Sequence, residues 1–368
     1  MPHTAEGIPY EDLQNTIELL MENLVHIRDD SGKFLLKLED GRTVDTKGWN
    51  GWDWTHGIGL YGMYRYHALT GSEKALSLVE DWFRARFQEG TVSKNVNTTC
   101  AFLTLACLYE ETRRAEYLPY LDRWLDWVYH DMPRTEEGGL QHITYDLENR
   151  QQLWDDTLMM TVLPLAKTGL LLGRPEYVAD AEKQFLLHAK YLEDHRTGLW
   201  FHGWSFLGRH NFGNVLWGRG NCWVTVAIPE FLEMTGLRPG DPVRESLLDT
   251  LRCQIKALAE LQDGSGLWHT VLNDPSSYLE ASATAGFAYG ILKAVRKRYV
   301  DPEYEKTGVR AVRGILKNIS PDGTLGQVSF GTPVFQTAEE YKAVPLTPMP
   351  YGQAMAILCL TEFLYRYI

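Results

Sequence analysis

The stretch DTLMMTVLPLAKTGLLL at residues 156–172 decides the fold, because most of it is apolar and yet it falls short of the ~20 residues of a membrane span. An apolar helix without a charged face belongs inside a large protein. The next stretch, EYVADAEKQFLLHAKYLE at 176–193, instead carries apolar residues three and four positions apart and charges on its other face. Residues 156–193 therefore predict a helical hairpin with one inner and one outer helix.

The same two kinds of segment alternate along the chain. The apolar segments span 52–69, 98–110, 156–172, 223–235, 282–295 and 353–365. The amphipathic segments span 11–28, 72–88, 115–130, 176–193, 243–262 and 303–318. Loop landmarks recur every 45 to 69 residues, at Trp52, Asn97, Asp156, Asn221, Ser282 and Tyr351. Six such hairpins predict an all-α toroid, an (α/α)6 barrel.

A closed ring is favoured over an open solenoid. A solenoid needs polar capping repeats at its ends, and the sequence has no such asymmetry. No Pro/Ser-rich linker divides the chain, so we expect a single domain over residues 1–368. Alternating strand patterns are short, at 33–38 and 325–330.

Composition narrows the class of protein. The 368 residues carry 36 Lys plus Arg against 48 Asp plus Glu, a net charge of −12 without a basic patch, which argues against nucleic acid as a partner. Five scattered cysteines without a CxxC pair predict buried, reduced thiols. The first residues lack the basic start and apolar segment of a signal peptide. We expect a soluble, cytoplasmic protein with no membrane partner, and the oligomeric state stays open.

The aromatic residues suggest a sugar-binding site. The chain has 12 Trp and 19 Tyr, many of them in the loops that precede the apolar segments. A toroid gathers these loops around one concave mouth, and flat rings mixed with polar groups suit stacking on sugar faces. Core packing is the alternative for about half of these tryptophans. The candidates for substrate contact are Trp54, Trp204, Trp217 and Trp223.

Two adjacent carboxylates carry the strongest indication of chemistry. The stretch QLWDDTLMM at 152–160 places Asp155 and Asp156 at the start of an apolar helix, about 100° apart on the helical wheel. Helix capping would explain one of them, and less readily both. A carboxyl that faces an aromatic, partly dry cavity should have a raised pKa and could donate a proton near neutral pH.

Histidines and one arginine add candidates without a metal signature. No HxxxH or HExxH pattern exists, so a zinc site is not expected. His142, His202 and His269 lie in loop contexts, the last two beside tryptophans, where structural and functional roles are both open. Arg219 lies between two glycines and could hold a substrate carboxylate with two hydrogen bonds. A structural ion pair is the equal alternative for Arg219.

An ordered set of motifs resembles a known family. The set comprises Trp-Asp-Trp-Thr-His-Gly (52–57), Gln-Leu-Trp-Asp-Asp-Thr-Leu-Met-Met (152–160), Phe-His-Gly-Trp (201–204), Trp-Gly-Arg-Gly-Asn (217–221), Asp-Gly-Ser-Gly-Leu-Trp-His (263–269) and Ser-Tyr-Leu-Glu-Ala-Ser-Ala-Thr-Ala (277–285). Together these motifs resemble the unsaturated rhamnogalacturonyl hydrolases of glycoside hydrolase family 105. The related unsaturated glucuronyl hydrolases of family 88 share that fold. The resemblance covers residues 10 to 365.

The resemblance implies an (α/α)6 barrel that acts on a small anionic oligosaccharide. Its expected substrate carries the 4,5-unsaturated uronic acid that polysaccharide lyases leave at a chain end. An aspartic acid protonates C4, water adds at C5, and the ring then opens, with no metal or organic cofactor. By motif position, Asp156 is the acid/base and His202 contacts the substrate.

The chain departs from the family pattern at two places. Asn97 occupies the position of a second aspartate that family members commonly carry, so we expect it to bind substrate rather than move a proton. Ile143 and Thr144 follow His142, where a basic residue is often found. The preferred uronide and the adjoining sugar therefore stay open.

Two other functions compete with this hypothesis. A sugar epimerase or isomerase on the same toroid would use His202 and His269 as a proton-shuttling pair. A carbohydrate-binding protein without catalysis would fit Asn97 but not an intact Asp156. With Asp156 as the catalytic residue and no metal ligand, the expected substrate-binding residues are Trp54, Asn97, His142, Asp155, His202, Trp204, Trp217, Arg219, Trp223 and His269.

Overall fold

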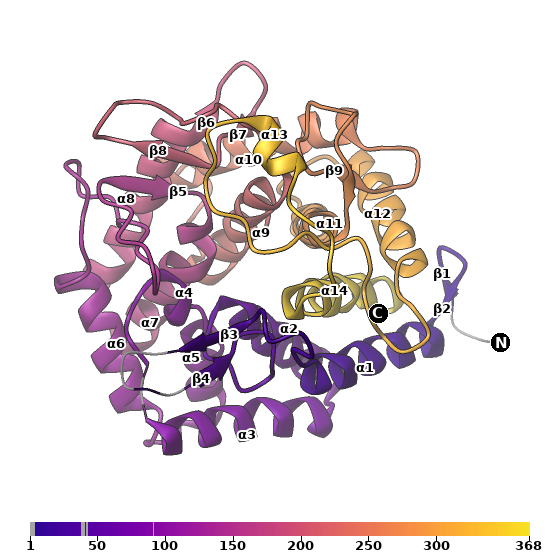
Figure 1. Ribbon diagram of the computed structural model, residues 1–368, viewed down its shortest axis with the longest axis horizontal. Coiled ribbons are helices and arrows are strands. Elements are labelled where there is room, and N and C mark those ends of the chain that lie inside the picture. Colours follow the sequence, from indigo (N-terminus) through magenta and orange to yellow (C-terminus); the bar gives the residue numbers. More distant parts are fainter. Residues whose placement is uncertain (1–3, 38–40, 42, 91) are drawn as a thin grey trace.

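The computed structural model describes residues 4–37, 41, 43–90 and 92–368, and arranges the long helices of these residues in two concentric rings (Figure 1). The inner helices are α2 (Trp54–Thr70), α5 (Ala101–Thr112), α7 (Leu163–Leu172), α9 (Gly218–Thr235), α11 (Ala281–Arg296) and α14 (Pro350–Phe363). The outer helices are α1 (Tyr10–His26), α3 (Glu73–Glu89), α6 (Leu118–His130), α8 (Pro175–Leu192), α10 (Pro242–Leu261) and α12 (Glu305–Lys317). The predicted (α/α)6 toroid is confirmed.

The inner ring is closed. Helices α2, α5, α7, α9, α11 and α14 pack in this order, and α14 returns to pack against both α1 and α2. Strands β1 (Thr4–Ala5) and β2 (Ile8–Pro9) and the 3-10 turn η3 (Leu364–Tyr367) complete the closure at the two ends of the described chain. There the rings of Tyr10 and Tyr367 lie edge to face at 5.4 Å, and the Tyr367 hydroxyl donates to the Ile8 carbonyl at 2.7 Å.

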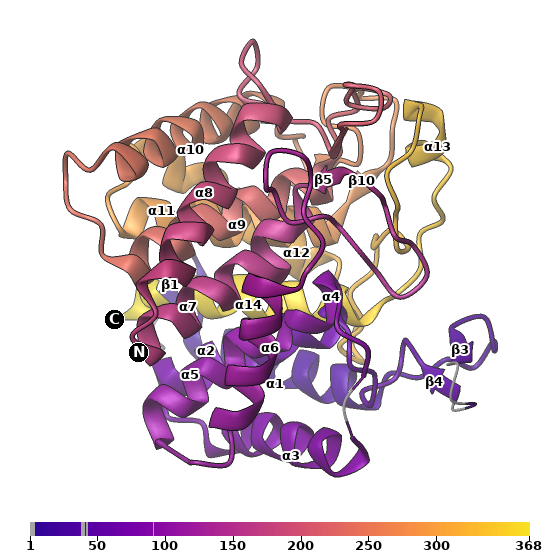
Figure 2. The ribbon, with the colours of Figure 1, turned by 90° about the vertical axis from the view of Figure 1, so that its left-hand side faces the viewer.

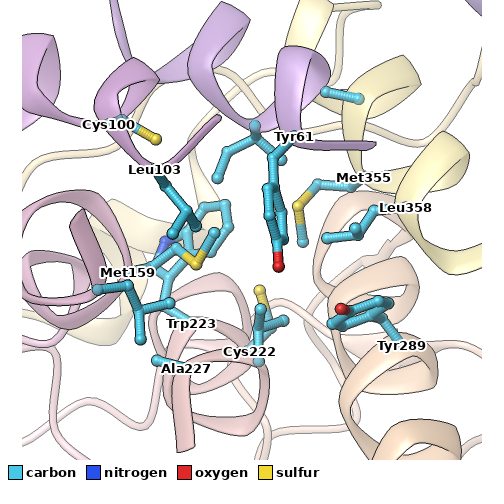
Figure 3. Packing of buried hydrophobic residues seen from close by; sticks show 14 of the residues in the cluster. Tyr61, Cys100, Leu103, Met159, Cys222, Trp223, Ala227, Tyr289, Met355 and Leu358 are labelled. Atoms are coloured by element: carbon cyan, nitrogen blue, oxygen red, sulfur yellow. The ribbon is translucent and has the colours of Figure 1, made fainter. Parts of the chain in front are cut away.

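The centre of the toroid is filled by side chains from every inner helix or the segment before it. Figure 3 shows them converging: Tyr61, Leu103, Met159, Cys222, Trp223, Tyr289 and Met355, all nearly inaccessible to solvent. Small residues let the backbones approach closely. A Cβ atom at Gly290 of α11 would overlap the backbone carbonyl of Thr225 on α9. The close contact between these two helices therefore requires glycine at position 290.

A buried ionic network lies in the C-terminal halves of α9 and α11. The Lys293 ammonium is within 2.5 Å of both Glu230 and Glu233, and the hydroxyls of Tyr61 and Tyr289 donate to Glu230. Removing one member of such a buried set leaves an uncompensated charge, which costs about 3–5 kcal/mol. Away from the mouth, polar groups therefore also hold the inner ring together.

The third inner segment starts irregularly. Between Asp156 and α7 the chain forms the π-helical segment η1 (Leu158–Val162), in which the Leu163 N–H bonds to the Leu158 carbonyl. Pro164 follows directly and has no N–H to donate, so a regular α-helical turn would lose a hydrogen bond there. The helix expected from Asp156 to Leu172 therefore forms over its whole length, with a wider π-helical stretch before α7. The second segment is divided into α4 (Val96–Thr99) and α5.

Short antiparallel strand pairs and loops decorate one end of the toroid. They are β3 (Leu35–Lys37) with β4 (Thr43–Asp45), β5 (Gln152–Trp154) with β8 (Gly203–Ser205), β6 (Glu193–Asp194) with β7 (Leu199–Trp200), and β9 (Trp268–His269) with β10 (Leu279–Glu280). Figure 2 shows β3, β4, β10 and α13 (Ala338–Lys342) on the side opposite the two termini. We call this end the mouth.

The strand expected at 325–330 does not form. Only isolated bridges occur, between Leu325 and Ile319 and between Ser329 and Leu346. Gln327 has a φ of 56°, in the left-handed region that interrupts a strand, and the Ser329 N–H donates to the Glu280 carboxylate instead of to a ladder. The expectation for 33–38 is met by β3, and residue 38 lies outside the described residues.

All five cysteines are free thiols, and four of them are buried as expected. Cys253 is exposed on outer helix α10, contrary to the prediction. Among the residues that the structure describes, we find no helix with the length and hydropathy to traverse a lipid bilayer.

The close approach of α9 and α11 leads to a first prediction. Gly290→Ala should lower the free energy of unfolding by about 1–3 kcal/mol, because its methyl group has to displace backbone rather than a flexible side chain. Urea unfolding measures this loss. Gly264→Ala is the control, since nothing lies within 4 Å of a Cβ there, and it should change stability by less than ~0.5 kcal/mol. Equal stabilities of the two variants would contradict the packing described.

Candidate active site

The mouth holds a pocket of about 380 Å³ at the N-terminal ends of the inner helices. It contains six of the residues expected from the sequence: Trp54, Asn97, His142, Asp156, Trp217 and Arg219. Its rim comes from the β3–β4 hairpin, the loop at 144–147 and the loop at 330–333. We call this cavity the mouth pocket. Its volume lies in the range of small-ligand sites.

The β5–β8 pair brings the carboxylates to a histidine. Trp154 pairs with Gly203 in the ladder, and the Asp155 N–H donates to the His202 carbonyl at 3.1 Å. Because of this register, the His202 Nε2 atom lies 3.3 Å from the Asp156 Oδ2 atom. Two residues from separate hairpins thus form one unit at the wall of the pocket.

Asp156 and Tyr341 together set the proton arrangement of His202. The Phe335 N–H donates to the Tyr341 hydroxyl oxygen at 3.1 Å, and this hydroxyl lies 2.8 Å from His202 Nδ1. Because an ionised Asp156 carboxylate only accepts hydrogen bonds, we assign the proton of the neutral His202 ring to Nε2, and Nδ1 then accepts from the Tyr341 O–H. The Nε2–H bond then faces the Asp156 carboxylate.

The pKa values of the two carboxyls move in opposite directions. Burial acts to raise the pKa of Asp156, but the hydrogen bond and the charge interaction with His202 outweigh it and hold this pKa below its usual range. Burial and the neighbouring Asp156 charge raise the pKa of Asp155 well above its usual range. The raised pKa expected at Asp156 is therefore found on Asp155, which corrects the sequence-based expectation.

His142 presents an uncharged ring to the pocket. It stacks on Trp154 at 4.2 Å, and its Nδ1 atom is 2.9 Å from the Thr157 hydroxyl. Burial lowers the pKa of His142 to about 4, so the ring is neutral at physiological pH. A neutral imidazole suits hydrogen bonding to a sugar hydroxyl.

Aromatic rings pack against one another beside the Asp156 carboxylate. Trp54 lies parallel to Tyr351 at 4.7 Å, and Trp217 lies 4.2 Å from His202. The Arg219 guanidinium lies 4.7 Å from the Trp217 ring centre and 4.9 Å from that of Tyr351. Of these rings, Trp54 and Trp217 line the pocket, where they can contact the apolar side of a pyranose, and Tyr351 supports Trp54 from behind.

Arg219 is committed to the protein rather than free for a ligand. Its guanidinium donates to the carbonyls of Ser329 and Phe330 and to the hydroxyls of Ser329 and Thr332, and it lies 3.7 Å from the Glu280 carboxylate. Of the two roles considered for Arg219, the structure therefore favours a structural ion pair over bidentate binding of a substrate carboxylate. Its hydrogen bonds hold the loop that forms one rim of the mouth pocket.

Several expected residues do not line the mouth pocket. Asp155 and His202 lie directly behind its wall. Trp204 packs on Tyr191 at 5.1 Å, and Trp223 is a core residue whose ring supports Trp54 edge to face at 5.6 Å. The His269 ring bonds to the Ser277 carbonyl at 2.6 Å, away from the pocket.

Three residues with evident roles were missed from the sequence. Asp53 caps α2 by accepting from the Trp54 N–H at 2.7 Å, and it lines the pocket. Burial and the Asp146 charge outweigh that hydrogen bond and raise the pKa of Asp53 to about 7. Lys33 on the rim forms no ion pair with any residue in the described part of the chain. Asp53 could have been found from the sequence, because it lies in the motif at 52–57. No local sequence pattern pointed to Lys33 or Tyr341.

One cluster has the composition of a metal site. Single ligand atoms of Asp155, Asp156 and His202 lie within 4.8 Å of one another. In the tautomer assigned above, the proton of His202 is on Nε2, the atom that faces the carboxylates. A protonated nitrogen has no lone pair for a cation, so the hydrogen-bond pattern favours a proton over a metal ion between these groups.

The fold and the pocket define a carbohydrate-active enzyme, and the comparisons specify it as a glycoside hydrolase. Residues 26–367 match the sequence profile of Glycosyl Hydrolase Family 88, and the chain belongs to this family. It is 33% identical over 316 residues to "Unsaturated rhamnogalacturonyl hydrolase YesR" of Bacillus subtilis, covering 85% of this chain and 90% of that protein.

Two solved structures are more similar still. Each is described as a possible member of the GH105 family. The protein from Klebsiella pneumoniae is 59% identical, with a TM-score of 0.97 over 99% of this chain and 96% of that one. The protein from Salmonella enterica is 58% identical, with a TM-score of 0.97 over 99% of this chain and 97% of that one. The family resemblance drawn from the ordered motifs is confirmed.

The raised pKa of Asp53 predicts a pH-dependent effect on stability. The folded state holds this proton up to about pH 7, whereas the unfolded chain releases it near pH 4, so folding is increasingly opposed as the pH rises between these values. Asp53→Asn keeps a helix-capping side chain and removes this penalty. We expect a rise in Tm of roughly 2 °C at pH 8 and a smaller one at pH 5, by scanning calorimetry. An equal change at both pH values would contradict the assignment.

Proposed function

We propose that this glycoside hydrolase removes the 4,5-unsaturated uronic acid from the non-reducing end of lyase-generated oligosaccharides, with the unsaturated rhamnogalacturonan disaccharide as substrate. The observation that carries the proposal is the Asp156–His202 unit at 3.3 Å, in the wall of an aromatic pocket of about 380 Å³. The name of the Bacillus subtilis relative supports the choice of uronide and adjoining sugar.

The proposed reaction begins at the double bond rather than at the anomeric carbon. Asp156 in its acid form protonates C4, which leaves a cation at C5 that the ring oxygen stabilises. Water attacks C5, and the Asp156 carboxylate takes up its proton. The hemiketal collapses with cleavage of the bond between C5 and the ring oxygen. The hemiacetal that this leaves at C1 then releases the next sugar. Ordinary glycosidases instead use two carboxylates at the acetal.

Different residues of the mouth pocket recognise different groups of the substrate. The rings of Trp54 and Trp217 are placed to stack on the sugar, and Asn97 and the neutral His142 offer hydrogen bonds to its hydroxyls. Because Arg219 is held by the loop at 329–332, we assign the substrate carboxylate to Lys33 on the β3–β4 hairpin. The lysine ammonium lies at the end of a long, flexible side chain, so it can reach an anion that enters the pocket from solvent.

The two competing functions lose support. The epimerase hypothesis needs His202 and His269 at one pocket, but the His269 ring is bonded to the Ser277 carbonyl outside it. Family membership makes the chain an enzyme rather than a binding protein.

We also propose that the enzyme acts as one domain in the cytoplasm. The buried side chains of all twelve long helices belong to one contiguous cluster, which supports a single domain. Five unpaired thiols support a reducing compartment, and the net charge of −12 argues against nucleic acid as a partner.

The acid/base role of Asp156 is tested by Asp156→Asn. The amide cannot donate or accept the proton that C4 requires, so we expect turnover to fall by at least ~10³-fold while the far-ultraviolet circular dichroism is unchanged. Loss of the enoate absorbance of an unsaturated rhamnogalacturonan disaccharide measures the rate.

Two controls accompany this measurement. Asp249→Asn, on the exposed face of α10, should retain full activity. Asp155→Asn should lose far less activity than Asp156→Asn at its own pH optimum. Equal losses from Asp155→Asn and Asp156→Asn would show that the proton donor has been wrongly chosen. If the wild-type enzyme consumed none of the unsaturated uronides, the proposed function would be wrong.

The role of Lys33 is tested by Lys33→Gln. The loss of one exposed charge should raise KM for the disaccharide by ~fivefold and leave kcat within about twofold. With the methyl ester of the same disaccharide, which has no charge, the KM values of wild type and variant should agree. Lys47→Gln is the matched control, because the Lys47 ammonium lies 5.4 Å over the Phe34 ring, outside the mouth pocket. A KM effect that is equal for both substrates would exclude carboxylate recognition by Lys33.

A further inference from the structure

Asp155 is a buried carboxyl that the proposed reaction does not use. Its side chain has no solvent exposure, and neither of its oxygens has a hydrogen-bond partner within the described residues. A buried carboxylate without donors or a counter-charge is strongly disfavoured. The group is therefore either neutral or matched by something that the protein chain does not supply.

The Asp155 carboxyl packs closely against the backbone of α9. A Cβ atom at Gly220 of α9 would overlap the Asp155 Oδ2 atom and lie 2.8 Å from Oδ1. Only glycine at position 220 leaves room for this side chain.

The charged and titratable groups around the pair come from five segments. Asp156 precedes η1, His202 lies between β7 and β8, the Cys222 thiol lies on α9, and the Tyr341 hydroxyl lies on α13. His142 acts on Asp156 from the pocket side, and Arg219 acts on His202 and Cys222 from α9. The Arg219 charge is balanced by Glu280 at 3.7 Å. These surroundings give Asp155 no cation of its own.

Asp155 and Asp156 differ in what stabilises their charge. The Nε2–H of His202 faces Asp156, and Tyr341 fixes this orientation from the other side of the ring. For Asp155, only backbone N–H groups at positions 155 and 156 favour the charged form, and burial and the Asp156 charge outweigh them. Two carboxyls this close in a dry site cannot both be ionised, so a single proton between them resides on the one that lacks a side-chain donor.

We propose that Asp155 is the proton store of the active site: it holds the single proton of the Asp155–Asp156 pair in the resting enzyme and passes it to Asp156 when substrate binds. This inference rests on the proposed function. The bound sugar displaces water from Asp156 and brings a second negative charge near it, and both changes favour protonation of Asp156.

The proton balance closes within the pair. The O–H bond of Asp155 breaks as the O–H bond of Asp156 forms, and the negative charge moves to Asp155. The O–H bond of Asp156 then breaks as the C4–H bond forms. Water adds at C5 and gives a proton to the Asp156 carboxylate, and that proton returns to Asp155. One water molecule is consumed in each cycle, and no other reactant is needed.

Infrared difference spectroscopy of the resting enzyme locates the proton without any turnover. At about pH 8.5, where Asp53 has lost its proton, we expect a protonated-carboxyl band in the wild-type enzyme that is missing in Asp155→Asn. In Asp156→Asn the band should remain and should titrate at a lower pH than in wild type, because the neighbouring negative charge is gone. A band that persists in Asp155→Asn and disappears in Asp156→Asn would overturn the proposal. A band in Asp156→Asn that titrates at the same pH as in wild type would also overturn the proposal. This second measurement tests the proposal even if Asp155→Asn does not fold.

The pH dependence of kcat/KM supplies a second readout. Without its store, Asp156 should lose its proton at lower pH, so the alkaline limb of the Asp155→Asn profile should move toward acid by ~2 units or more. Asp249→Asn, remote from the pocket, should keep the wild-type profile. If the alkaline limb of the kcat/KM profile stayed in place in Asp155→Asn, the role of Asp155 as a proton store would be contradicted.

Titration with Zn²⁺ and Mn²⁺ examines the metal alternative for the same cluster. We expect neither ion to raise the Tm or the activity of the wild-type enzyme. A rise that Asp155→Asn abolishes would place a cation where we place the proton and would overturn the proposal. Because the infrared bands report on the resting protein, they decide the position of the proton even if the proposed substrate were wrong.

Discussion

The enzyme depends on one electrostatic constraint, the burial of two adjacent carboxyls in a space that only one of them shares with solvent. Asp155 is fully buried, whereas the side chain of Asp156 keeps 18% of its surface exposed toward the pocket. Their charges cannot coexist without a proton or a counter-ion, and His202 stabilises the charge of one of them. The surrounding backbone keeps the two carboxyls in these different environments, one fully buried and the other facing the pocket.

The fold creates the asymmetry through backbone geometry. The β5–β8 ladder places His202 next to Asp156, and the π turn η1 follows the two aspartates in the chain. Gly220 on α9 leaves the cavity for Asp155. These contributions come from two neighbouring hairpins, so the site depends on the contact between the third and fourth hairpins of the ring.

Much of the architecture could be predicted from periodicity. The twelve helical segments follow from the alternation of apolar and amphipathic stretches, because each inner helix buries its whole surface and each outer helix only one stripe. The expected strand at 325–330 was wrong because its alternating residues pack as a loop against Glu280 and Arg219 rather than in a ladder. Short-range patterns cannot distinguish these two environments.

The candidate site was predictable only where a local motif carried it. Asp156, His142 and the aromatic residues Trp54 and Trp217 were found because they lie at the start of inner segments or in the loops before them. The commitment of Arg219 to its loop was not visible, since it depends on residues more than 100 positions away. The pKa values of the pair depend on which carboxyl meets His202, and that is a matter of three-dimensional contact.

The most direct test of the account is a crystal structure of the Asp156→Asn variant with an unsaturated rhamnogalacturonan disaccharide bound. We expect the unsaturated ring against Trp54 and Trp217, with C4 as the sugar atom nearest to the side chain at position 156. A disaccharide whose glycosidic oxygen is nearest to that side chain would contradict protonation of the double bond and indicate an ordinary attack at the acetal.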